Sequence, residues 1–409
     1  MSLSNRVAIL GGGASGLMAA LTAARAGANV TIYEHNNGVG KKILASGNGR
    51  CNIINTTVSP EDYAGLDPSF VEYALQQLPF EAFETFCHSI GLLLECKSDG
   101  RCYPLSNEAK AVLIAFKSAV TDAGVKILTE KKVTALTKEK KGFVVHCENE
   151  KSVYDKVLIA TGSQAAPQLG ATDDGYRFAS EFGHEIIPQY PSLVQLHLNS
   201  KIHHKMAGVK TFAEVTLTID NKPLTKVQGD ILFASYGISG LAILDISQRA
   251  SHALMQHQRV AIGINLLPHF DTQTLRVMLE KLFSCVPNRS LETVLSTLIP
   301  GKTIVHLCEE VAVNPSKAVS LLSDKELQKL IYLIQNWKFE VNGTHGFKHA
   351  EVSGGGVATV QINDKTMESK LVKGLYFAGE VLDIVGRRGG YNFNFAWASG
   401  IIAGREMGK

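Results

Sequence analysis

Long apolar runs, charged residues and cysteines are all scarce in this 409-residue sequence. No apolar run approaches the ~18 residues that a membrane-spanning helix requires, so we expect no transmembrane segment. The apolar stretch at the N-terminus is too short for a secretory signal, which favours a soluble, cytoplasmic protein. Charged residues make up 19% of the chain and hydrophobic residues 45%, so the chain can bury a large core. This composition excludes a disordered chain and a coiled coil.

The seven cysteines argue against a disulfide framework and against a structural zinc site. Their number is odd and no pair has C-x-x-C spacing, so we expect reduced thiols. The histidines show no metal-ligand spacing, and we expect no structural metal. His203 and His204 are adjacent, and on an expected strand their rings would point apart. The net charge of only +3 does not indicate a dedicated nucleic-acid binder, although it leaves room for a local basic patch.

Glycine is abundant by contrast, with 37 residues in the chain. The first cluster, Gly11 to Gly16, has the spacing G-x-G-x-x-G. A β-type run at 6–10 precedes it, and an Ala- and Leu-rich helical pattern at 17–26 follows it. A second strand-like run at 29–33 then ends at Glu34. This order of strand, glycine-rich turn, helix, strand and acid predicts a dinucleotide-binding unit of the Rossmann type.

Each part of this pattern has a role in holding a dinucleotide. Gly11 permits the tight turn, Gly13 lets the backbone approach the pyrophosphate, and Gly16 lets the helix pack close to the strand. The N-terminus of the helix offers free N–H groups to the phosphates. Glu34 lies 18 residues after Gly16, and we expect it to accept hydrogen bonds from a ribose. The pattern alone does not distinguish FAD from NAD.

Two later segments favour FAD. A buried-strand run at 155–161 is closed by Gly162, and residues 374–380 repeat the order of apolar strand, glycine and acid, ending at Glu380. A further glycine cluster then leads into a helical pattern at 395–407. This arrangement resembles two-dinucleotide flavoproteins, which implies an acid at the ribityl chain and a helix N-terminus directed at the flavin ring. A plain NAD dehydrogenase has no need of such a returning segment.

Residues 40–52 form a second motif, Gly-Lys-Lys-Ile-Leu-Ala-Ser-Gly-Asn-Gly-Arg-Cys-Asn. Lys41 and Lys42 come soon after the ribose-binding acid and are placed to reach the diphosphate as point charges. Residues 46–49 would make a bare backbone loop that can approach a flat ring. We therefore expect this motif to lie against the cofactor.

The end of the same motif carries side chains with possible roles beside the flavin. Arg50 and Asn52 can donate hydrogen bonds to flavin carbonyls or to a substrate. Cys51 fits a place beside the ring, although a small buried hydrophobe is the simpler interpretation. The Gly-Arg-Cys triplet recurs at 100–102, directly before Tyr103, and this repeat has no clear explanation in the sequence.

The chain resembles a family of bacterial flavoproteins known as NAD(FAD)-utilising dehydrogenases, or aminoacetone-oxidase-like proteins. Four blocks carry the resemblance and span nearly the whole chain: 11–16, 40–52, 229–240 and 350–392. The resemblance implies an α/β fold in which a Rossmann-like FAD-binding domain, of the two-dinucleotide-binding type, is interrupted by a small β-barrel domain and a helical insert. It also implies diverse substrates, because the family includes bile-acid reductase and ribosomal-RNA dihydrouridine synthase relatives.

On this basis we expect three domains. The FAD-binding domain would comprise 1–190 and 351–409, the β-barrel-like insert 191–270 and 338–350, and the helical insert 271–337. The barrel strands are predicted from alternating or apolar runs at 194–198, 213–219, 231–235 and 260–266.

Two helix starts are predicted within the helical insert. Asn314 followed by Pro315 is typical of an N-cap with proline at the first helical position. Ser323 and Glu326 have the spacing of a capping box ahead of an apolar helical pattern.

The predicted cofactor site draws on all of the glycine-rich motifs and on the segments that follow the predicted strands. Its residues are Gly11, Gly13, Ala14, Ser15, Gly16, Glu34, Lys41, Lys42, Ser46, Gly47, Arg50, Cys51, Asn52, Val133, Ala160, Thr161, Gly162, Gly379, Glu380, Asp383, Gly390, Asn392 and Phe393.

These features predict an FAD-dependent oxidoreductase that reduces a conjugated C=C bond, or oxidises a small substrate, through the flavin. No second strand, G-x-G-x-x-G and helix appears in the middle of the chain, so NADH or NADPH would dock transiently over the flavin, or another donor would serve. Reduction of a C=C bond needs an acid to protonate the carbon that does not receive hydride. The candidate catalytic residues are Tyr391, Cys51 and Tyr103.

Two alternatives remain open beside this small-molecule enzyme. One is a flavin-dependent enzyme that forms dihydrouridine in ribosomal RNA, and the other is a non-catalytic flavin-binding sensor. The first is motivated by basic residues that solvated lysine-rich loops would explain equally well. These residues are His203, His204, Lys205, Lys210, Lys131, Lys132, Lys138, Lys140 and Lys141.

Overall fold

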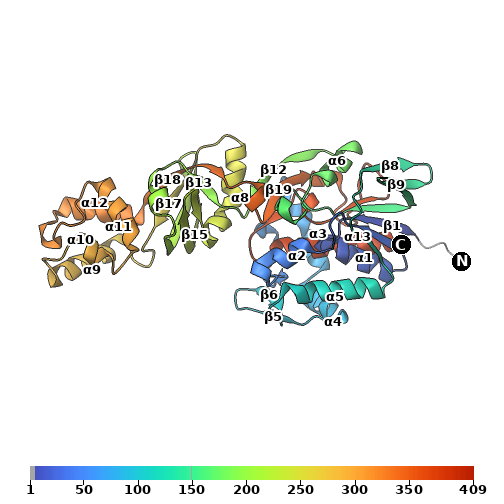
Figure 1. The fold of residues 1–409 in the computed structure, drawn as a ribbon, viewed down its shortest axis with the longest axis horizontal. Helices are drawn as coiled ribbons and strands as arrows, with labels where there is room; N and C mark the ends of the chain where they lie inside the picture. Colours follow the sequence, from blue (N-terminus) through green and yellow to red (C-terminus); the bar gives the residue numbers. More distant parts are fainter. Residues whose placement is uncertain (1–4, 149) are drawn as a thin grey trace. The chain divides into compact units, whose positions relative to one another are not determined.

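The computed structural model describes residues 5–148 and 150–409, and the chain divides into two compact units. The first unit comprises Met1–Tyr190 and Glu351–Lys409, and the second comprises Pro191–Ala350. Each unit encloses its own hydrophobic core. Figure 1 shows the blue N-terminal segments and the red C-terminal helix in the same unit, as this division requires.

The first unit is built around a five-stranded parallel sheet with the strand order β20-β11-β1-β2-β7. Its strands are β1 Arg6–Leu10, β2 Asn29–Tyr33, β7 Lys126–Leu128, β11 Lys156–Ile159 and β20 Leu375–Phe377. The strand sequences are nearly continuous apolar runs because both faces of the sheet are covered. The chain order reverses beside β1, so the carboxyl ends of β1 and β11 flank the point where open α/β sheets bind ligands.

Helices cover one face of this sheet and a three-stranded meander covers the other (Figure 1). The helices are α1 Ala14–Arg25, α5 Ala109–Asp122 and α13 Tyr391–Gly408, and the meander is β8 Ala135–Glu139, β9 Gly142–Cys147 and β10 Glu150–Tyr154. Glycines at every fourth position of α13 let it approach α1 closely. A Cβ at Gly400 would lie 2.7 Å from the Ser15 carbonyl oxygen, and one at Gly404 would lie 2.6 Å from that of Ala19.

Shorter elements of the first unit surround the carboxyl end of the sheet. They are α2 Lys41–Ala45, β3 Ile54–Asn55, β4 Tyr63–Ala64, α3 Val71–Gln77, α4 Phe80–Ser89, β5 Leu94–Cys96, β6 Arg101–Pro104, α6 Asp174–Glu181, β12 Ile186–Ser192, β19 Val352–Val357 and β21 Val385–Gly386.

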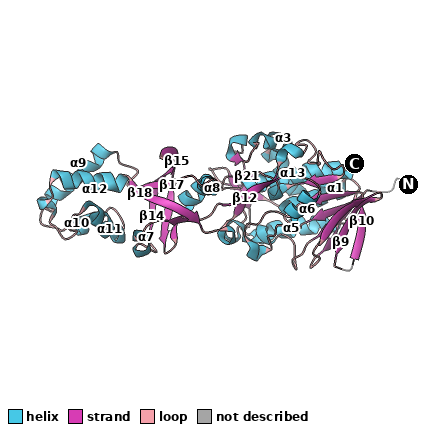
Figure 2. Ribbon diagram, turned by 90° about the horizontal axis from the view of Figure 1, so that it is seen from above, coloured by secondary structure: helices cyan, strands magenta, loops and turns pink. Residues whose placement is uncertain are grey.

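The second unit contains a closed antiparallel barrel of strand order β13-β16-β15-β14-β17-β18. Its strands are β13 Leu196–Leu198, β14 Lys210–Ile219, β15 Lys222–Ala234, β16 Gly237–Ser239, β17 Val260–Asn265 and β18 Trp337–Thr344. Its helices are α7 Ile202–Lys205, α8 Leu241–Met255, α9 Thr272–Cys285, α10 Leu291–Leu295, α11 Gly301–Val311 and α12 Asp324–Gln335. Figure 2 shows α9 to α12 as a helical group beside the magenta barrel strands, and both share one core.

Three details of this unit differ from the sequence-based expectations. Trp337 begins β18 instead of ending the helical segment. No helix starts at Asn314, whose side-chain oxygen accepts a hydrogen bond from the Ser316 amide at 2.9 Å in a turn. That prediction was wrong because an asparagine turn and a helix N-cap use the same local hydrogen bond. The helix α8 was not predicted at all.

The capping box at the start of α12 is confirmed. Ser323 Oγ accepts from the Glu326 amide, and Glu326 Oε2 accepts from the Ser323 amide at 2.7 Å. Lys317 also binds Glu326, and the pKa of this carboxyl lies near 2, chiefly because of the Lys317 hydrogen bond.

Ser323→Ala is therefore expected to lower the free energy of unfolding by about 1 kcal/mol, because helix N-H groups lose their partner. Denaturant unfolding followed by circular dichroism measures this change. Ser284→Ala is the matched control, since the Ser284 hydroxyl only donates to the Lys281 carbonyl inside α9. Equal effects of the two substitutions would contradict the capping role.

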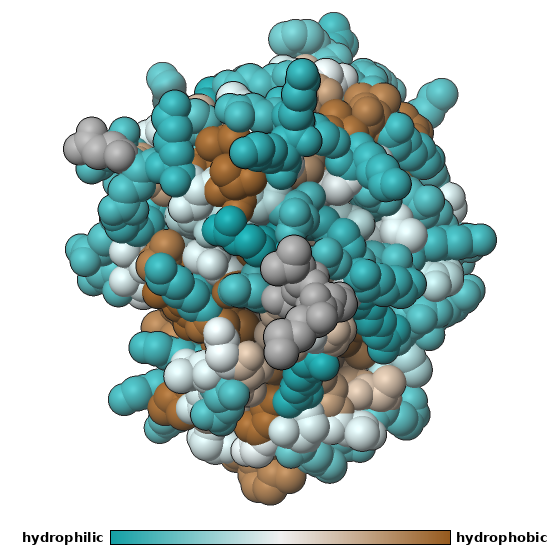
Figure 3. Space-filling view, turned by 90° about the vertical axis from the view of Figure 1, so that its right-hand side faces the viewer, coloured by the Kyte–Doolittle hydropathy of each residue, from teal (hydrophilic) through white to brown (hydrophobic). Residues whose placement is uncertain are grey.

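Within the described residues, no helix combines the length and the apolar character needed to span a bilayer. Hydrophilic residues dominate the face shown in Figure 3, and the hydrophobic residues on it form separate patches.

Candidate cofactor-binding and active site

In the glycine-rich loop after β1, two glycines are required by close packing of the backbone, and a third borders open space. A Cβ at Gly11 would lie 2.4 Å from the Ala160 carbonyl oxygen, and one at Gly16 would lie 2.0 Å from that of Gly11. A Cβ at Gly13 would meet nothing within 4 Å, and its φ of −80° suits any residue. Gly13 is the N-cap of α1, which has no side-chain cap and no acid in its first turn. The open space at Gly13 therefore lies beside the free N–H donors of the first turn of α1. This combination is what a phosphate-binding site requires.

Glu34 lies beside this loop at the end of β2 and is buried. Its Oε2 accepts from the Gly12 amide at 3.0 Å, and its Oε1 accepts from the backbone and side-chain nitrogens of Asn36, both at 2.9 Å. Lys41 Nζ donates to Asn36 Oδ1 at 3.0 Å. The backbone just before Val133 runs beside Glu34, which places Val133 in the same neighbourhood. The carboxylate thus braces the loop and keeps lone pairs for a further hydrogen-bond donor.

Glu380 is the second acid of the site and follows β20. Its Oε2 accepts from Lys42 Nζ at 2.6 Å, and its Oε1 accepts from Ser163 Oγ at 2.8 Å and from the Ser353 amide at 2.9 Å. Ser163 and Ser353 were not predicted as site residues. The position of Ser163, directly after Gly162 at the end of a sheet strand, was the available signal. These contacts join four distant segments at the carboxyl end of the parallel sheet.

Three buried polar atoms near these acids and near α13 have no hydrogen-bond partner in the part of the chain that the structure describes: Thr161 Oγ1, Tyr176 OH and Asn52 Oδ1. Burial raises the pKa of Tyr176, and the charges of Glu380 and Asp383 raise it further. A buried polar group without a partner costs about 1–3 kcal/mol. Since a flavin dinucleotide carries hydroxyl, carbonyl and ring N–H groups, these atoms and the open space at Gly13 fit FAD. Tyr176 on α6 was missed by the sequence analysis.

The N-terminus of α13 forms the far side of the predicted site. Gly390 is its N-cap with φ +98°, and a Cβ there would lie 3.0 Å from Asn52 Oδ1. The Asn392 side chain exchanges two 2.8 Å hydrogen bonds with the backbone of Gly386, so it holds the preceding loop. Phe393 stacks on the indole of the same helix. The helix has no acid in its first turn and offers its amides to a ligand.

The other predicted contacts of this segment are placed as follows. Gly379 has φ +75°, and a Cβ there would lie 2.5 Å from Ser15 Oγ, which donates to the Ala378 carbonyl at 3.2 Å. Asp383 is buried and accepts from the Leu66 amide at 2.9 Å. Gly379 therefore packs the returning segment closely against α1, and Asp383 anchors it to the loop before α3.

The loop at 46–52 is held by its own backbone. The Cys51 amide donates to the Ser46 carbonyl at 3.1 Å, and Arg50 Nε donates to the Gly47 carbonyl at 3.2 Å. The Arg50 guanidinium lies 5.5 Å from the centre of the Tyr103 ring. This brings the second motif and one of the catalytic candidates together.

The three catalytic candidates have different surroundings. Cys51 is fully buried, and burial raises the pKa of its thiol to about 12. The thiol therefore stays protonated and is a weak acid and nucleophile at neutral pH. Tyr391 packs edge-on against Tyr63, whose hydroxyl donates to the Tyr391 carbonyl at 2.9 Å, and the Arg387 guanidinium lies over the Tyr391 ring. The ring of Tyr391 is thus in contact with both Tyr63 and Arg387.

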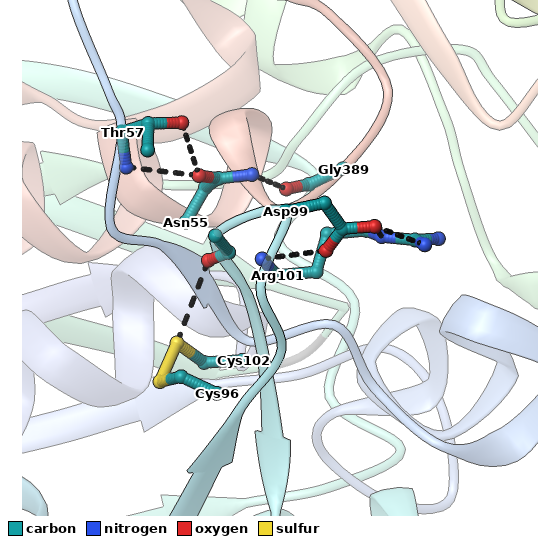
Figure 4. The surroundings of a disulfide bond; sticks show 8 residues. Asn55, Thr57, Cys96, Asp99, Arg101, Cys102 and Gly389 are labelled. Carbon is teal, nitrogen blue, oxygen red and sulfur yellow. Dashed lines mark hydrogen bonds and ion pairs between the residues drawn. A yellow bond between two sulfur atoms is a disulfide. The ribbon is translucent and has the colours of Figure 1, made fainter.

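The expectation of reduced thiols is wrong for two cysteines, because Cys96 and Cys102 form a disulfide (Figure 4). They are directly opposite each other in the antiparallel pair β5–β6, and their Cα atoms are 4.0 Å apart. Their separation in sequence carries no signal until the hairpin is known. Figure 4 also shows how β3 connects this hairpin to the loop before α13, since Asn55 Nδ2 donates to the Gly389 carbonyl at 2.9 Å.

Thiol counting tests the disulfide. In denaturant without reductant we expect five cysteines to react with an alkylating agent, and all seven after reduction. Cys96→Ser is the control, because it leaves six reactive thiols under both conditions. Seven reactive thiols before reduction of the wild-type protein would contradict the bond.

The adjacent histidines of the second unit do not lie on a strand. His203 and His204 belong to α7, and their ring centroids are 4.2 Å apart, so the prediction that the rings point apart was wrong. Among residues 5–148 and 150–409, no group of three or more His, Cys, Asp or Glu side chains is arranged to hold a metal ion.

Comparison with known proteins gives matches along nearly the whole chain. A family model described as HI0933-like protein Rossmann domain matches residues 5–406. The 3-dehydro-bile acid delta(4,6)-reductase of Clostridium scindens is 35% identical over 407 residues, covering 99% of each chain. The ribosomal RNA dihydrouridine synthases of Haemophilus influenzae and Escherichia coli are 33% and 31% identical, each covering 98% of this chain and 97% of its own.

Solved structures show the same fold at low identity. A 3-ketosteroid-delta4-(5alpha)-dehydrogenase from Rhodococcus jostii matches with TM-score 0.50 and 16% identity, covering 100% of this chain and 97% of its own. A 3-ketosteroid delta1-dehydrogenase from Sterolibacterium denitrificans matches with TM-score 0.52 and 12% identity, covering 99% and 100%.

Proposed function

The chain belongs to the HI0933-like family of Rossmann-domain proteins and is an FAD-dependent oxidoreductase, and from this premise we propose that it reduces a C=C bond conjugated to a carbonyl group. Support comes from the bile-acid reductase that it resembles over its full length. When bound, FAD supplies the hydride. NADH or NADPH, docking transiently, is the proposed source of electrons.

The chain's own groups bind and orient the cofactor in this proposal. The amides at the start of α1 and the space at Gly13 take the pyrophosphate, and Glu34 takes a ribose. Glu380, fixed by Lys42, and the unpartnered Tyr176 hydroxyl would hold the ribityl side of the cofactor. The open space at Gly13 beside an uncapped helix is the observation that carries this assignment.

A proton must reach the carbon that does not receive hydride. We assign this role to Tyr391, because its ring is fixed by Tyr63 and Arg387 beside the loop that precedes α13. Cys51 is a poorer donor because burial raises the pKa of its thiol. Tyr103, under Arg50, is the second candidate.

Anaerobic reoxidation tests the reaction. The purified protein is expected to be yellow and to release flavin on denaturation. After photoreduction without oxygen, an α,β-unsaturated steroid ketone is expected to restore the oxidised spectrum and to gain two hydrogens by mass spectrometry. The matched saturated ketone is the control. A reduced flavin that no conjugated enone reoxidises faster than the saturated ketone would contradict the proposal.

Uridine in ribosomal RNA is a second candidate substrate. The specific support is the pair of dihydrouridine synthases that the chain resembles over its full length. The chemistry is related, since forming dihydrouridine also saturates a C=C bond conjugated to a carbonyl. Nucleoside mass spectrometry of ribosomal RNA from a deletion strain is expected to show loss of dihydrouridine, restored by the wild-type gene. Unchanged dihydrouridine would reject this candidate and leave the enone reaction standing.

A further inference from the structure

Nine of the thirteen histidines lie in the second unit, and five of these are linked by short ring contacts or electrostatic interaction. We call these five the histidine cluster: His197, His203, His204, His345 and His349. His197 Nε2 and His345 Nδ1 are 2.9 Å apart, so one of them donates a hydrogen bond to the other. The ring centroids of His345 and His349 are 4.0 Å apart. His203 lies within electrostatic reach of both His204 and His197. Protonated imidazoles at these separations repel each other, and a bound anion would relieve the repulsion.

Strand pairing places the histidine cluster at one end of the barrel. His197 lies on β13, which pairs with β18, and His345 directly follows β18. His197 is also opposite Gly237 of β16, which brings in Tyr236. The Tyr236 ring stacks on His345 with centroids 4.0 Å apart and planes 21° from parallel. The short helix α7 packs against β15 and β16.

Burial first and neighbouring imidazoles second lower the pKa values of two cluster members, and no carboxylate among the described residues contributes to either shift. Burial lowers the pKa of His345, and the charges of His349 and His197 lower it further. Burial also lowers the pKa of His203, as do the charges of His204 and His197, while a hydrogen bond with the Ser235 backbone opposes this shift. Both rings are therefore short of protons near neutral pH in the free protein.

Carboxylates on the surrounding elements have other partners. Glu340 Oε2 accepts from Asn199 Nδ2 at 3.1 Å, and Glu309 Oε2 lies 2.9 Å from His306 Nδ1. Other charged groups on or beside these segments are Lys201, Lys205, Lys348, Glu351 and the Lys210–Asp230 ion pair, and Asp245 lies on α8, which packs against β16 and β18. Charges of both signs therefore flank the histidine cluster, and the carboxylates of Glu340, Glu309 and Asp230 are engaged with other groups.

Two buried polar atoms at this end of the barrel have no partner among residues 5–148 and 150–409: His203 Nδ1 and Gln195 Oε1. The His203 side chain is only 3% exposed. The Gln195 carbonyl accepts from the His345 amide at 2.9 Å, so Gln195 belongs to the same group. His204 and His349 are exposed, so a ligand can reach the cluster from solvent. An unpartnered buried nitrogen beside an accessible cluster points to a missing hydrogen-bonding ligand.

We propose that the histidine cluster binds a phosphate group, carried by a phosphomonoester or a phosphodiester. A phosphate ester brings about one to two negative charges and several acceptor oxygens, which match several imidazolium N–H donors. Because binding favours the protonated rings, the affinity rises as the pH falls through the histidine range. The Tyr236–His345 stack provides a flat surface for a base next to the phosphate.

Titration of the FAD-loaded protein with sulfate tests the site, because the charge of sulfate is constant across this range. We expect binding about tenfold tighter near pH ~6 than near pH ~8. His345→Phe keeps a ring to stack on Tyr236 but removes both nitrogens, so we expect it to weaken binding by about tenfold or more. His257→Asn is the matched control, since His257 is exposed and has a left-handed φ of 58° that asparagine adopts readily.

His349→Ala changes an exposed member of the cluster and repeats the test without risk to folding. Competition identifies the source of the phosphate: adenosine monophosphate displaces sulfate from a phosphomonoester site, and short single-stranded RNA displaces it from a phosphodiester site. The proposal is overturned if sulfate does not bind, binds equally at both pH values, binds His345→Phe as well as wild type, or is displaced by neither competitor. These readouts need no turnover, so they are independent of the proposed reaction.

Discussion

Replacing Gly13 with valine is expected to give a folded protein that retains essentially no FAD. The backbone at Gly13 is extended, with φ −80° and ψ −168°, and a Cβ would meet nothing within 4 Å. The fold itself therefore has no need of glycine there beyond about 1 kcal/mol of N-cap preference. Binding of the proposed pyrophosphate does require glycine, because a branched side chain would occupy the place of the pyrophosphate against the amides of α1. The flavin-to-protein ratio, from absorbance after purification, measures the loss.

Two matched variants separate cofactor loss from misfolding. Gly301→Val makes the same change at another open glycine without positive φ, in the second unit, and is expected to keep its flavin. Gly16→Ala is expected to disturb the fold itself, because its Cβ would lie 2.0 Å from the Gly11 carbonyl oxygen. If Gly13→Val keeps its flavin, the pyrophosphate is not where the glycine-rich loop predicts it.

The Rossmann unit was predictable because its signals are local. Gly11, Gly16 and Glu34 lie within one strand–turn–helix–strand stretch. The residue type required at each position follows from its spacing in this motif. The late strand β20 was also predicted and pairs with β11 in the parallel sheet. Ser323 and Glu326 were predictable for the same reason, since a capping box spans only four residues.

Features that depend on distant segments escaped the sequence analysis. Tyr176 becomes a candidate cofactor contact only because α6 brings it within reach of the charges of Glu380 and Asp383, some 200 residues later. The Cys96–Cys102 bond requires the register of β5 and β6. Physical pattern rules describe neighbours along the chain, whereas these contacts are set by how separate elements pack.

Replacing Tyr391 with phenylalanine is expected to slow substrate reduction by about 10²- to 10⁴-fold while leaving the flavin bound, since this is the usual contribution of a positioned general acid. The substitution removes only the hydroxyl. The edge-on packing with Tyr63, the Arg387 guanidinium over the ring and the backbone hydrogen bond at the Tyr391 carbonyl all stay in place. Stopped-flow measurement separates the two half-reactions. Flavin reduction by the electron donor is expected to keep its rate, because proton donation to substrate occurs only in the second half-reaction.

Tyr103→Phe is the matched control, because it removes the same hydroxyl from a ring that also lies beneath a guanidinium, that of Arg50. If Tyr391 is the acid, Tyr103→Phe reoxidises with substrate at close to the wild-type rate, and only Tyr391→Phe alters how fast solvent deuterium enters the product. If Tyr103→Phe reduces substrate much more slowly while Tyr391→Phe has a normal rate, the acid is Tyr103 on β6. Normal rates in both would mean that the proton comes from neither tyrosine. The Cys51 thiol would be a poor substitute, because burial raises its pKa to about 12.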